Sequence, residues 1–329
     1  MTMIDFDVKK NMSAFAYYYA KLRKLNKLND ILAVRKLSSN WYDAVLFRTG
    51  IKKKFVMRLR DGKSIQINNY QDYSNFRESE DALNNRINYI RCLGYKIDLD
   101  KKAKLIKIIK FDKEILFYYD DLKQAGSTVG MIEENFVNEQ YKNLDVKDKD
   151  VVDIGANIGD TAIYFALKGA KHVYAFEPYP YSYNLAKKNI ELNKLENKIT
   201  LLNEGCGKEG FVTIESKTKN YGGTDLKSFD TGIKIKISSL DLIAEKFKLN
   251  NAILKIDCEG CEYKTVLTAN NKTLQKFNQI IIEYHYGYKN LKRKLEEAGF
   301  KVRYTLPNFI YNNYAKKREM YAGILFVKH

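Results

Sequence analysis

From residue 151 to the C-terminus, short apolar segments alternate with amphipathic ones. Runs rich in β-branched residues, such as Val151–Ile154, Ile253–Ile256 and Ile280–Ile282, predict buried strands. Between them, apolar residues recur every three or four positions, which predicts helices. Alternating strands and helices are typical of a doubly wound, mostly parallel sheet. This half of the chain therefore predicts an α/β domain whose ligands bind at the carboxyl ends of the strands.

The first part of the chain has a different pattern. Leucine and isoleucine recur at helical spacing between basic residues over 13–37, and residues 71–92 also predict helix. Two hairpins are expected, one around the Asp61-Gly62 turn and one over 105–119. These elements predict a mixed α+β region.

The boundary between the two regions is expected at the Ala125-Gly126-Ser127 segment, which reads as a break in the pattern. Residues 1–127 would then form a basic α+β accessory region that could contribute to acceptor binding. Residues 128–329 would form the catalytic domain.

A glycine turn directly after the strand at 151–154 carries the clearest chemical signal. The segment Asp153-Ile-Gly155-Ala-Asn157-Ile-Gly159-Asp-Thr161 bends a strand into a helix, as nucleotide-cofactor sites do. A carboxylate at Asp153 would repel a pyrophosphate but attract the sulfonium and ammonium of S-adenosyl-L-methionine. Glu177 ends the next predicted strand, 24 residues after Asp153, and could bind both ribose hydroxyls. We therefore expect S-adenosyl-L-methionine as the cofactor.

The other expected cofactor contacts also follow predicted strands. Asn203 and Glu204 end the third strand, where such sheets usually face the adenine, and Asp257 ends the fourth. The predicted cofactor-binding set is Asp153, Gly155, Asn157, Gly159, Thr161, Glu177, Pro178, Asn203, Glu204 and Asp257.

The predicted catalytic residues lie at the ends of two adjacent strands. Side chains two apart on an extended segment share a direction, so Asp257 with Glu259, and Glu283 with His285, could converge on an acceptor hydroxyl. His285 is the best candidate for the base because an unperturbed histidine has a pKa of about 6.5. Asp257 or Glu259 is the alternative base if burial raises its pKa, and His285 could instead be a neutral core histidine.

Two further interpretations of these residues stay open. Asp257, Glu259, Glu283 and His285 could together hold a divalent metal ion, although we expect no metal site. Cys258 and Cys261 form a C-x-x-C pair, which elsewhere signals zinc or redox chemistry, but the sequence has no second such pair. Four cysteines in 329 residues are too few for a disulfide framework, which fits a reducing compartment.

Four motifs together resemble the FkbM family of S-adenosylmethionine-dependent methyltransferases. They are the glycine turn, Ala175-Phe-Glu-Pro178, Leu254-Lys-Ile-Asp-Cys-Glu-Gly-Cys-Glu262 and Ile282-Glu-Tyr-His285, and the resemblance covers roughly residues 130–305. It implies a class I methyltransferase fold, which is Rossmann-like with an antiparallel last strand, here from residues 300–304 and 321–327. It also implies, usually, methyl transfer to an oxygen of a sugar, glycan or secondary metabolite.

Charge raises the question of other partners. The net charge is +17, and residues 1–60 alone contain fourteen Lys and Arg against four Asp and Glu. This surplus favours either an ordinary solvated basic face or contact with nucleic acid or anionic membrane. A nucleic-acid methyltransferase, acting on RNA, is therefore the alternative function, and a non-catalytic binding protein is a third. No apolar run is long enough to cross a membrane and no secretory signal is visible, so we expect a cytoplasmic protein. The oligomeric state does not follow from the sequence.

Overall fold

The computed structural model describes residues 10–17, 38–48, 50–77, 79–214, 231–312 and 318–329. The chain forms two compact units, Met1–Leu22 with Tyr141–His329, and Arg23–Gln140.

The domain boundary expected near residue 127 falls inside helix α6 (Leu122–Ile132). The Asp121 side chain caps this helix by accepting a hydrogen bond from the Gln124 backbone N–H. Ala125, Val129 and Ile132 are buried at helical spacing, so the helix continues through the predicted break.

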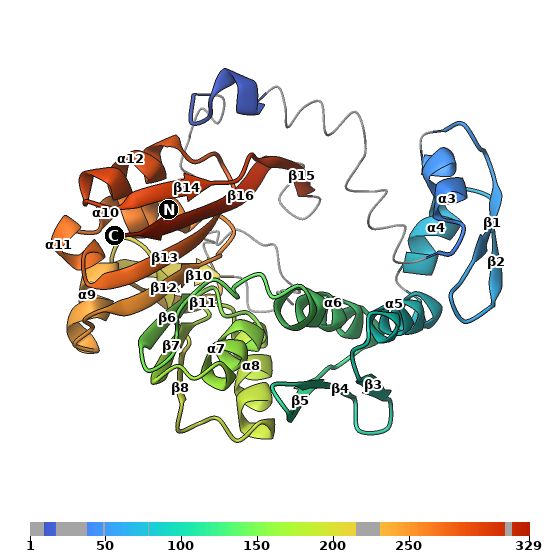
Figure 1. The fold of residues 1–329 in the computed structure, drawn as a ribbon, viewed down its shortest axis with the longest axis horizontal. Helices are drawn as coiled ribbons and strands as arrows, with labels where there is room; N and C mark the ends of the chain where they lie inside the picture. The colour runs from blue at the N-terminus through green and yellow to red at the C-terminus, as the bar shows by residue number, and fades with distance from the viewer. Residues whose placement is uncertain (1–9, 18–37, 49, 78, 215–230, 313–317) are drawn as a thin grey trace. The chain divides into compact units, whose positions relative to one another are not determined.

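The larger unit is built on one sheet, which Figure 1 shows at its centre. Its first five strands in space are parallel, while the last strand of the chain runs antiparallel between two neighbours. The spatial order is β8 (Ile199–Leu202), β7 (His172–Phe176), β6 (Asp150–Ile154), β12 (Ala252–Ile256), β13 (Phe277–Tyr284), β16 (Arg318–Lys328) and β14 (Lys301–Tyr304), with β15 (Asn308–Asn312) paired to β16. The predicted fold class, a mostly parallel class I methyltransferase sheet with an antiparallel last strand, is confirmed.

Helices pack against this sheet and bury its central strands. Every residue of β12 is buried, which explains its continuous apolar sequence. In Figure 1, α7 and α8 lie by β6 to β8, and the remaining helices lie by β12 to β14. They are α7 (Asp160–Leu167), α8 (Pro180–Leu192), α9 (Leu240–Lys246), α10 (Glu262–Thr268), α11 (Asn271–Leu274) and α12 (Lys289–Glu297).

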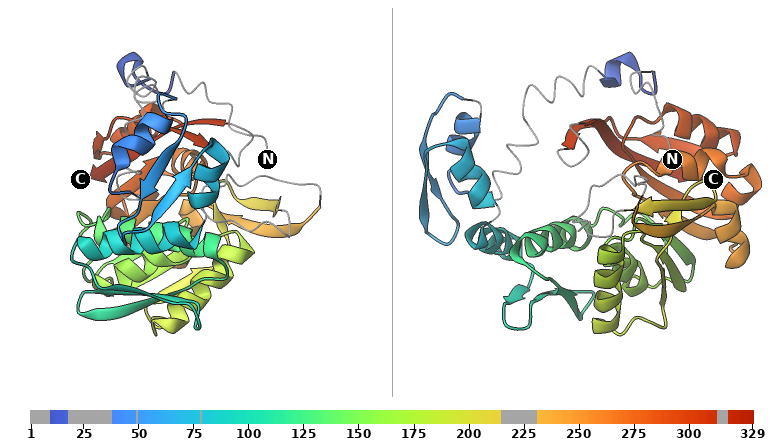
Figure 2. Two further views of the ribbon diagram at one scale, coloured as in Figure 1. Left: turned by 90° about the vertical axis from the view of Figure 1, so that its right-hand side faces the viewer. Right: turned by 180° about the vertical axis from the view of Figure 1, so that it is seen from behind.

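A small second sheet projects from this unit, as Figure 2 shows. It contains β9 (Gly205–Cys206), β10 (Gly210–Ile214) and β11 (Ile233–Ser238), with β10 and β11 antiparallel. Residues 215–230, between β10 and β11, lie outside the described part of the chain.

The smaller unit confirms both predicted hairpins. They are β1 (Phe55–Arg58) with β2 (Ser64–Ile67), and β4 (Leu105–Lys110) with β5 (Lys113–Tyr118). An additional strand, β3 (Ile97–Asp100), pairs with β4. The other elements are α3 (Trp41–Arg48), α4 (Tyr70–Arg77), α5 (Glu80–Cys92) and a π-helical turn over Glu133–Val137 that follows α6.

The helical structure expected over 71–92 is confirmed, and it is divided into two helices, α4 and α5. The Ser79 side chain accepts a hydrogen bond from the Ala82 backbone N–H and so starts α5 as a new helix.

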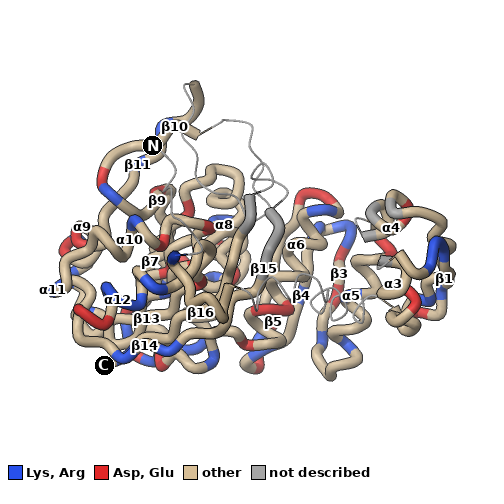
Figure 3. Tube along the Cα trace, turned by 90° about the horizontal axis from the view of Figure 1, so that it is seen from above, with Lys and Arg blue, Asp and Glu red and all other residues tan. Residues whose placement is uncertain are grey.

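Two expectations about surfaces can be compared with the described residues. Lys and Arg are distributed along both units and mixed with Asp and Glu (Figure 3). Of the basic helical segment expected over 13–37, residues 14–17 are helical and residues 18–37 lie outside the described part. Within the described residues, no helix has both the length and the apolar character needed to span a membrane.

Candidate active site

The glycine turn joins β6 to α7 and brings the chain against the end of β12. Gly155 has a φ of +81°, and a Cβ at this position would lie 1.8 Å from the Asp257 carbonyl oxygen. Gly159 begins α7 with a φ of +83°, and its Cβ would lie 3.3 Å from Ala186. The left-handed backbone favours glycine at both positions, and at Gly155 the available space requires it as well.

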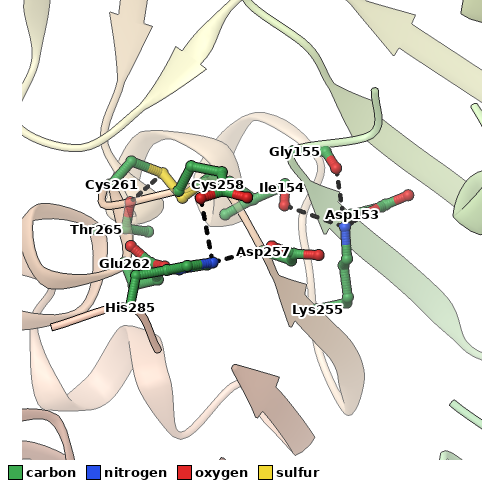
Figure 4. Close-up of a disulfide and its surroundings, with 11 residues drawn as sticks. Asp153, Ile154, Gly155, Lys255, Asp257, Cys258, Cys261, Glu262, Thr265 and His285 are labelled. Atoms are coloured by element: carbon green, nitrogen blue, oxygen red, sulfur yellow. Dashed lines mark hydrogen bonds and ion pairs between the residues drawn. A yellow bond between two sulfur atoms is a disulfide. The ribbon is translucent and has the colours of Figure 1, made fainter. Parts of the chain in front are cut away.

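Asp153 lies beneath this turn and is completely buried. Its carboxylate accepts a hydrogen bond from the Thr161 hydroxyl (2.5 Å) and forms an ion pair with the Lys255 ammonium (2.9 Å). Lys255 also donates to the Gly155 carbonyl oxygen (2.9 Å), as Figure 4 shows. Burial alone would lower the pKa of Lys255, but Asp153 and Asp257 outweigh it and raise the pKa. Lys255 therefore keeps its charge and neutralises Asp153.

This ion pair changes the electrostatic argument made from the sequence. Asp153 is not an unpaired charge facing a ligand, because Lys255 holds it. The sequence contains one sign of this pair: Lys255 is a charged residue within the otherwise apolar strand β12, which predicts a buried acidic partner.

Glu177 follows β7 and lies directly under the turn. Its two carboxylate oxygens accept hydrogen bonds from the backbone N–H groups of Asn157 and Tyr179, both at 2.9 Å. Burial raises the pKa of Glu177 to about 7, although these two N–H groups act in the opposite direction. Each oxygen retains a lone pair for a further donor, so this carboxylate fits the two hydroxyls of an adenosine ribose.

The other two strand-end residues have structural partners. Asn203 donates hydrogen bonds to the carbonyl oxygens of Glu177 and Pro178, at 2.8 and 3.0 Å, and so holds the segment that carries Glu177. Glu204 accepts a hydrogen bond from the Ser238 hydroxyl (2.5 Å). Neither contact tests the predicted adenine interaction.

Four side chains converge at the carboxyl ends of β12 and β13. His285 Nε2 lies 3.4 Å from Glu259, 3.9 Å from Asp257 and 4.0 Å from Glu283, measured to the nearest carboxylate oxygen. The His285 ring is only 2% exposed, while the three carboxylates are partly open to solvent. The structure thus brings together all four predicted catalytic residues.

A fifth residue, Glu262, was missed by the sequence analysis. Its fully buried carboxylate pairs with His285 Nδ1 from the first turn of α10. Glu262 ends the acidic segment Cys-Glu-Gly-Cys-Glu262, so the sequence contained a signal for it. Nothing in the sequence near Glu262 indicates that its partner is His285, which follows β13.

Electrostatics around His285 differ from the sequence-based expectation. Burial would lower the pKa of His285, but Glu259 and Glu262 outweigh this effect and raise it well above the usual value. Without a bound cation these surroundings favour the protonated imidazole, so the argument from an unperturbed pKa does not hold. The alternative already considered, a carboxylate base, fits these surroundings better.

Cys258 and Cys261 form a disulfide beside this cluster, as Figure 4 shows. The bridge closes the loop between β12 and α10, and Glu259 within it has a positive φ of 57°. We had not expected a disulfide in this chain. Oxidised sulfurs cannot act as thiolate ligands, so the bridge also argues against zinc at the C-x-x-C pair.

An N-terminal residue, Asn11, binds the segment that directly follows His285. Asn11 donates a side-chain hydrogen bond to the Tyr286 carbonyl oxygen (2.9 Å), and its side-chain oxygen accepts one from the Asn290 N–H (2.9 Å). The Asn11 carbonyl oxygen accepts two more from the N–H groups of Tyr288 and Lys289. No local sequence pattern connects residues this far apart.

Comparison with known proteins identifies the family. Residues 153–302 match the methyltransferase FkbM domain. An uncharacterized protein of Sulfolobus islandicus rod-shaped virus 1 is 32% identical in an alignment of 164 residues that covers 47% of this chain and 74% of that protein. The ribosomal protein L11 methyltransferase of Carboxydothermus hydrogenoformans is 44% identical over 54 residues, covering 16% of this chain and 18% of that enzyme.

Among solved structures, the METTL16 methyltransferase domain has a TM-score of 0.38 and 14% identity, covering 83% of this chain and 86% of that one. This distant likeness says nothing of function.

The cofactor follows from the family and agrees with the site. Glu177 is a buried carboxylate with capacity for two hydroxyl donors, and the tight Gly155 turn leaves the loop backbone close to Asp257. S-adenosyl-L-methionine is the cofactor, and it supplies the activated methyl group when bound. This chain belongs to the FkbM family of S-adenosylmethionine-dependent methyltransferases.

Proposed function

We propose that this chain is an O-methyltransferase that acts on a hydroxyl of a sugar, a glycan or a related metabolite. The cluster of Asp257, Glu259, Glu283 and His285 is the observation that carries this proposal. Its three carboxylates are hydrogen-bond acceptors only, so they match a substrate rich in hydroxyl donors.

In this proposal the cluster orients the acceptor and accepts its proton. The acceptor O–H bond breaks as its proton passes to a carboxylate, and the oxygen forms a bond to the methyl carbon. Bound S-adenosyl-L-methionine would supply this methyl group, and its sulfur would keep the electron pair of the carbon–sulfur bond as the leaving group. Alignment of these atoms contributes up to about 7 to 11 kcal/mol in favourable cases, and proton removal adds roughly 10² to 10⁴ in rate.

The cofactor end of the site is assigned to residues around the glycine turn. We propose Glu177 for the ribose, the backbone from Gly155 to Gly159 for the amino-acid portion, and Asn203 or Glu204 for the adenine. Asp153 and Thr161 would support the turn from beneath, because Asp153 is paired with Lys255 and Thr161. Pro178 would contribute beside the turn, next to Glu177.

Mass spectrometry of cell extract incubated with isotopically labelled S-adenosyl-L-methionine tests the function directly. We expect a labelled methyl group on a hydroxyl-rich product, and none when Asp257→Asn enzyme is used. Transfer to nitrogen or carbon alone would contradict the proposal.

RNA is the second candidate acceptor, because residues 1–60 carry a surplus of ten positive charges. Transfer to RNA with binding that weakens steeply with salt would favour it. The acidic cluster argues against it, since three carboxylates repel a phosphate backbone. The cytoplasmic location and contact with anionic membrane also stay proposals, and both can be tested by cell fractionation.

A further inference from the structure

Asp257, Glu259 and His285 present one ligand atom each, and these atoms lie within 4.8 Å of one another. Two ligands that each lie about 2.1 Å from a metal ion are about 3.0 Å apart at a right angle and about 3.4 Å apart at a tetrahedral angle. The observed separations from His285 Nε2 are 3.4 Å to Glu259 and 3.9 Å to Asp257. Small side-chain rotations would therefore suffice to close these three groups around an ion.

His285 is an observation independent of the acidic residues. Only 2% of its side chain is exposed, and its Nδ1 is held by the Glu262 carboxylate. That contact directs Nε2 into the acidic cluster, and 3.4 Å to the nearest of these carboxylate oxygens is longer than a good hydrogen bond. A histidine held by a carboxylate at one nitrogen, with the other directed at further ligands, is the usual arrangement of a metal-binding imidazole.

Charge balance also favours a cation here. Four carboxylates surround His285, from Asp257, Glu259, Glu262 and Glu283. Lys255, the buried cation of β12, is already paired with Asp153. Buried or partly buried charges in proteins are generally paired or bind metal ions, so this acidic excess fits a divalent ion.

We propose that Asp257, Glu259 and His285 bind a divalent metal ion, with Mn²⁺ as the best match. Carboxylate oxygens suit Mg²⁺ and Mn²⁺, and one imidazole shifts the preference toward a transition metal. This deepens the proposed function and rests on it for the role of the ion, which would polarise the acceptor hydroxyl and favour loss of its proton. Glu283 then remains the carboxylate that accepts this proton.

The test is Mn²⁺ binding to the full-length protein, without cofactor or acceptor. Chelator-treated and dialysed protein is titrated with MnCl₂, and free Mn²⁺ is followed by electron paramagnetic resonance. We expect one saturable site per chain. Glu259→Gln and His285→Gln should weaken it at least tenfold, and Glu262→Gln should weaken it by about 10- to 100-fold through the orientation of His285.

Glu245→Gln, a change at an exposed position on α9, is the matched control and should bind Mn²⁺ like the unmodified protein. Circular dichroism and adenosine binding establish that each variant is folded. Absence of a saturable site, or unchanged affinity in folded Glu259→Gln and His285→Gln, would overturn the metal site.

Two further outcomes separate this inference from the proposed function. Undiminished methyl transfer by chelator-treated enzyme would reject the metal's role and leave the O-methyltransferase standing. Saturable Mn²⁺ binding without transfer to any hydroxyl would reject that function and leave the metal site standing.

Discussion

The ammonium of Lys255 lies 2.9 Å from the carboxylate of Asp153, in a place where both side chains are almost fully buried. The two residues are paired across adjacent parallel strands, β12 and β6. Lys255 also donates to the Gly155 carbonyl oxygen, so this one side chain links the cofactor turn to the strand that carries Asp257. The pair therefore joins the two halves of the site.

Lys255→Met should strongly destabilise the protein. It leaves the Asp153 carboxylate buried without its cation, and breaking a buried pair in this way costs about 3 to 5 kcal/mol. Urea denaturation measures the free energy of unfolding. The double variant Asp153→Asn with Lys255→Met should recover much of the loss, and a double variant as unstable as Lys255→Met would show that the pairing is not the cause.

Gly155→Ala should abolish cofactor binding. The new Cβ would lie 1.8 Å from the Asp257 carbonyl oxygen, so the turn or the end of β12 must move. Calorimetric titration with S-adenosylhomocysteine measures the effect. Gly94→Ala is the control, because Gly94 has a similar φ of +91° but nothing within 4 Å of its Cβ position. Equal effects of the two changes on cofactor binding would reject the close approach as the reason.

Local sequence patterns predicted most of the sheet, because the periodicity that marks a strand or a helix depends on residues close together in sequence. The same logic brought Glu283 and His285 to one side of an extended chain. Partners distant in sequence were not visible, which is why Lys255 with Asp153, and Glu262 with His285, came only from the structure.

Boundaries were predicted less well than elements. Gly126 looked like a break, but buried apolar residues on one face carry α6 through it. Ser79 looked like part of a helix, but its side chain caps the start of α5. Burial of its apolar face determines that α6 continues, and one capping hydrogen bond determines where α5 begins. Helix propensity alone predicts neither.

Glu177 should make stability depend on pH. Its folded pKa of about 7 lies above the ordinary value of 4.5, so the folded state binds this proton more tightly than the unfolded state. The resulting stability is fully present below about pH 4.5 and is lost as pH rises through about 7, by roughly 3 kcal/mol. Urea denaturation of the unmodified protein and of Glu177→Gln between pH 5 and 8 measures the difference, and parallel curves would contradict the assignment.

Adenosine binding should show the opposite trend with pH. Ribose hydroxyls donate to the ionised carboxylate, so binding favours loss of the Glu177 proton. With a pKa of about 7, the apparent Kd for adenosine should fall about tenfold between pH 6 and pH 8. Adenosine itself does not titrate in this range. Calorimetry in two buffers of different ionisation enthalpy would detect the released proton, and no proton release would argue against Glu177 as the ribose ligand.

Removing the Cys258–Cys261 disulfide should loosen the acidic loop. The bridge closes a short loop, for which chain entropy predicts about 2 kcal/mol of stabilisation. The double variant Cys258→Ser with Cys261→Ser should lose about this much in urea denaturation, and dithiothreitol should have the same effect on the unmodified protein. Cys92→Ser changes an exposed free cysteine and serves as the control. A double variant that still responds to dithiothreitol would show that the effect lies elsewhere.

Asn11 should support the site although it lies far away in sequence. Asn11→Ala removes two side-chain hydrogen bonds to the segment after His285, those with Tyr286 and Asn290, at a cost of about 1 to 3 kcal/mol. Because Tyr286 directly follows His285, we expect slower methyl transfer as well as lower stability.

Ser13→Ala is the matched control for Asn11→Ala. The Ser13 hydroxyl accepts a hydrogen bond from the Ala16 N–H within the same N-terminal segment. Its loss should lower stability slightly through that local contact and leave the rate of transfer unchanged. If both variants slowed transfer equally, the N-terminal segment as a whole would be responsible. A reduced rate for Asn11→Ala alone assigns the effect to its hydrogen bonds with the segment after His285.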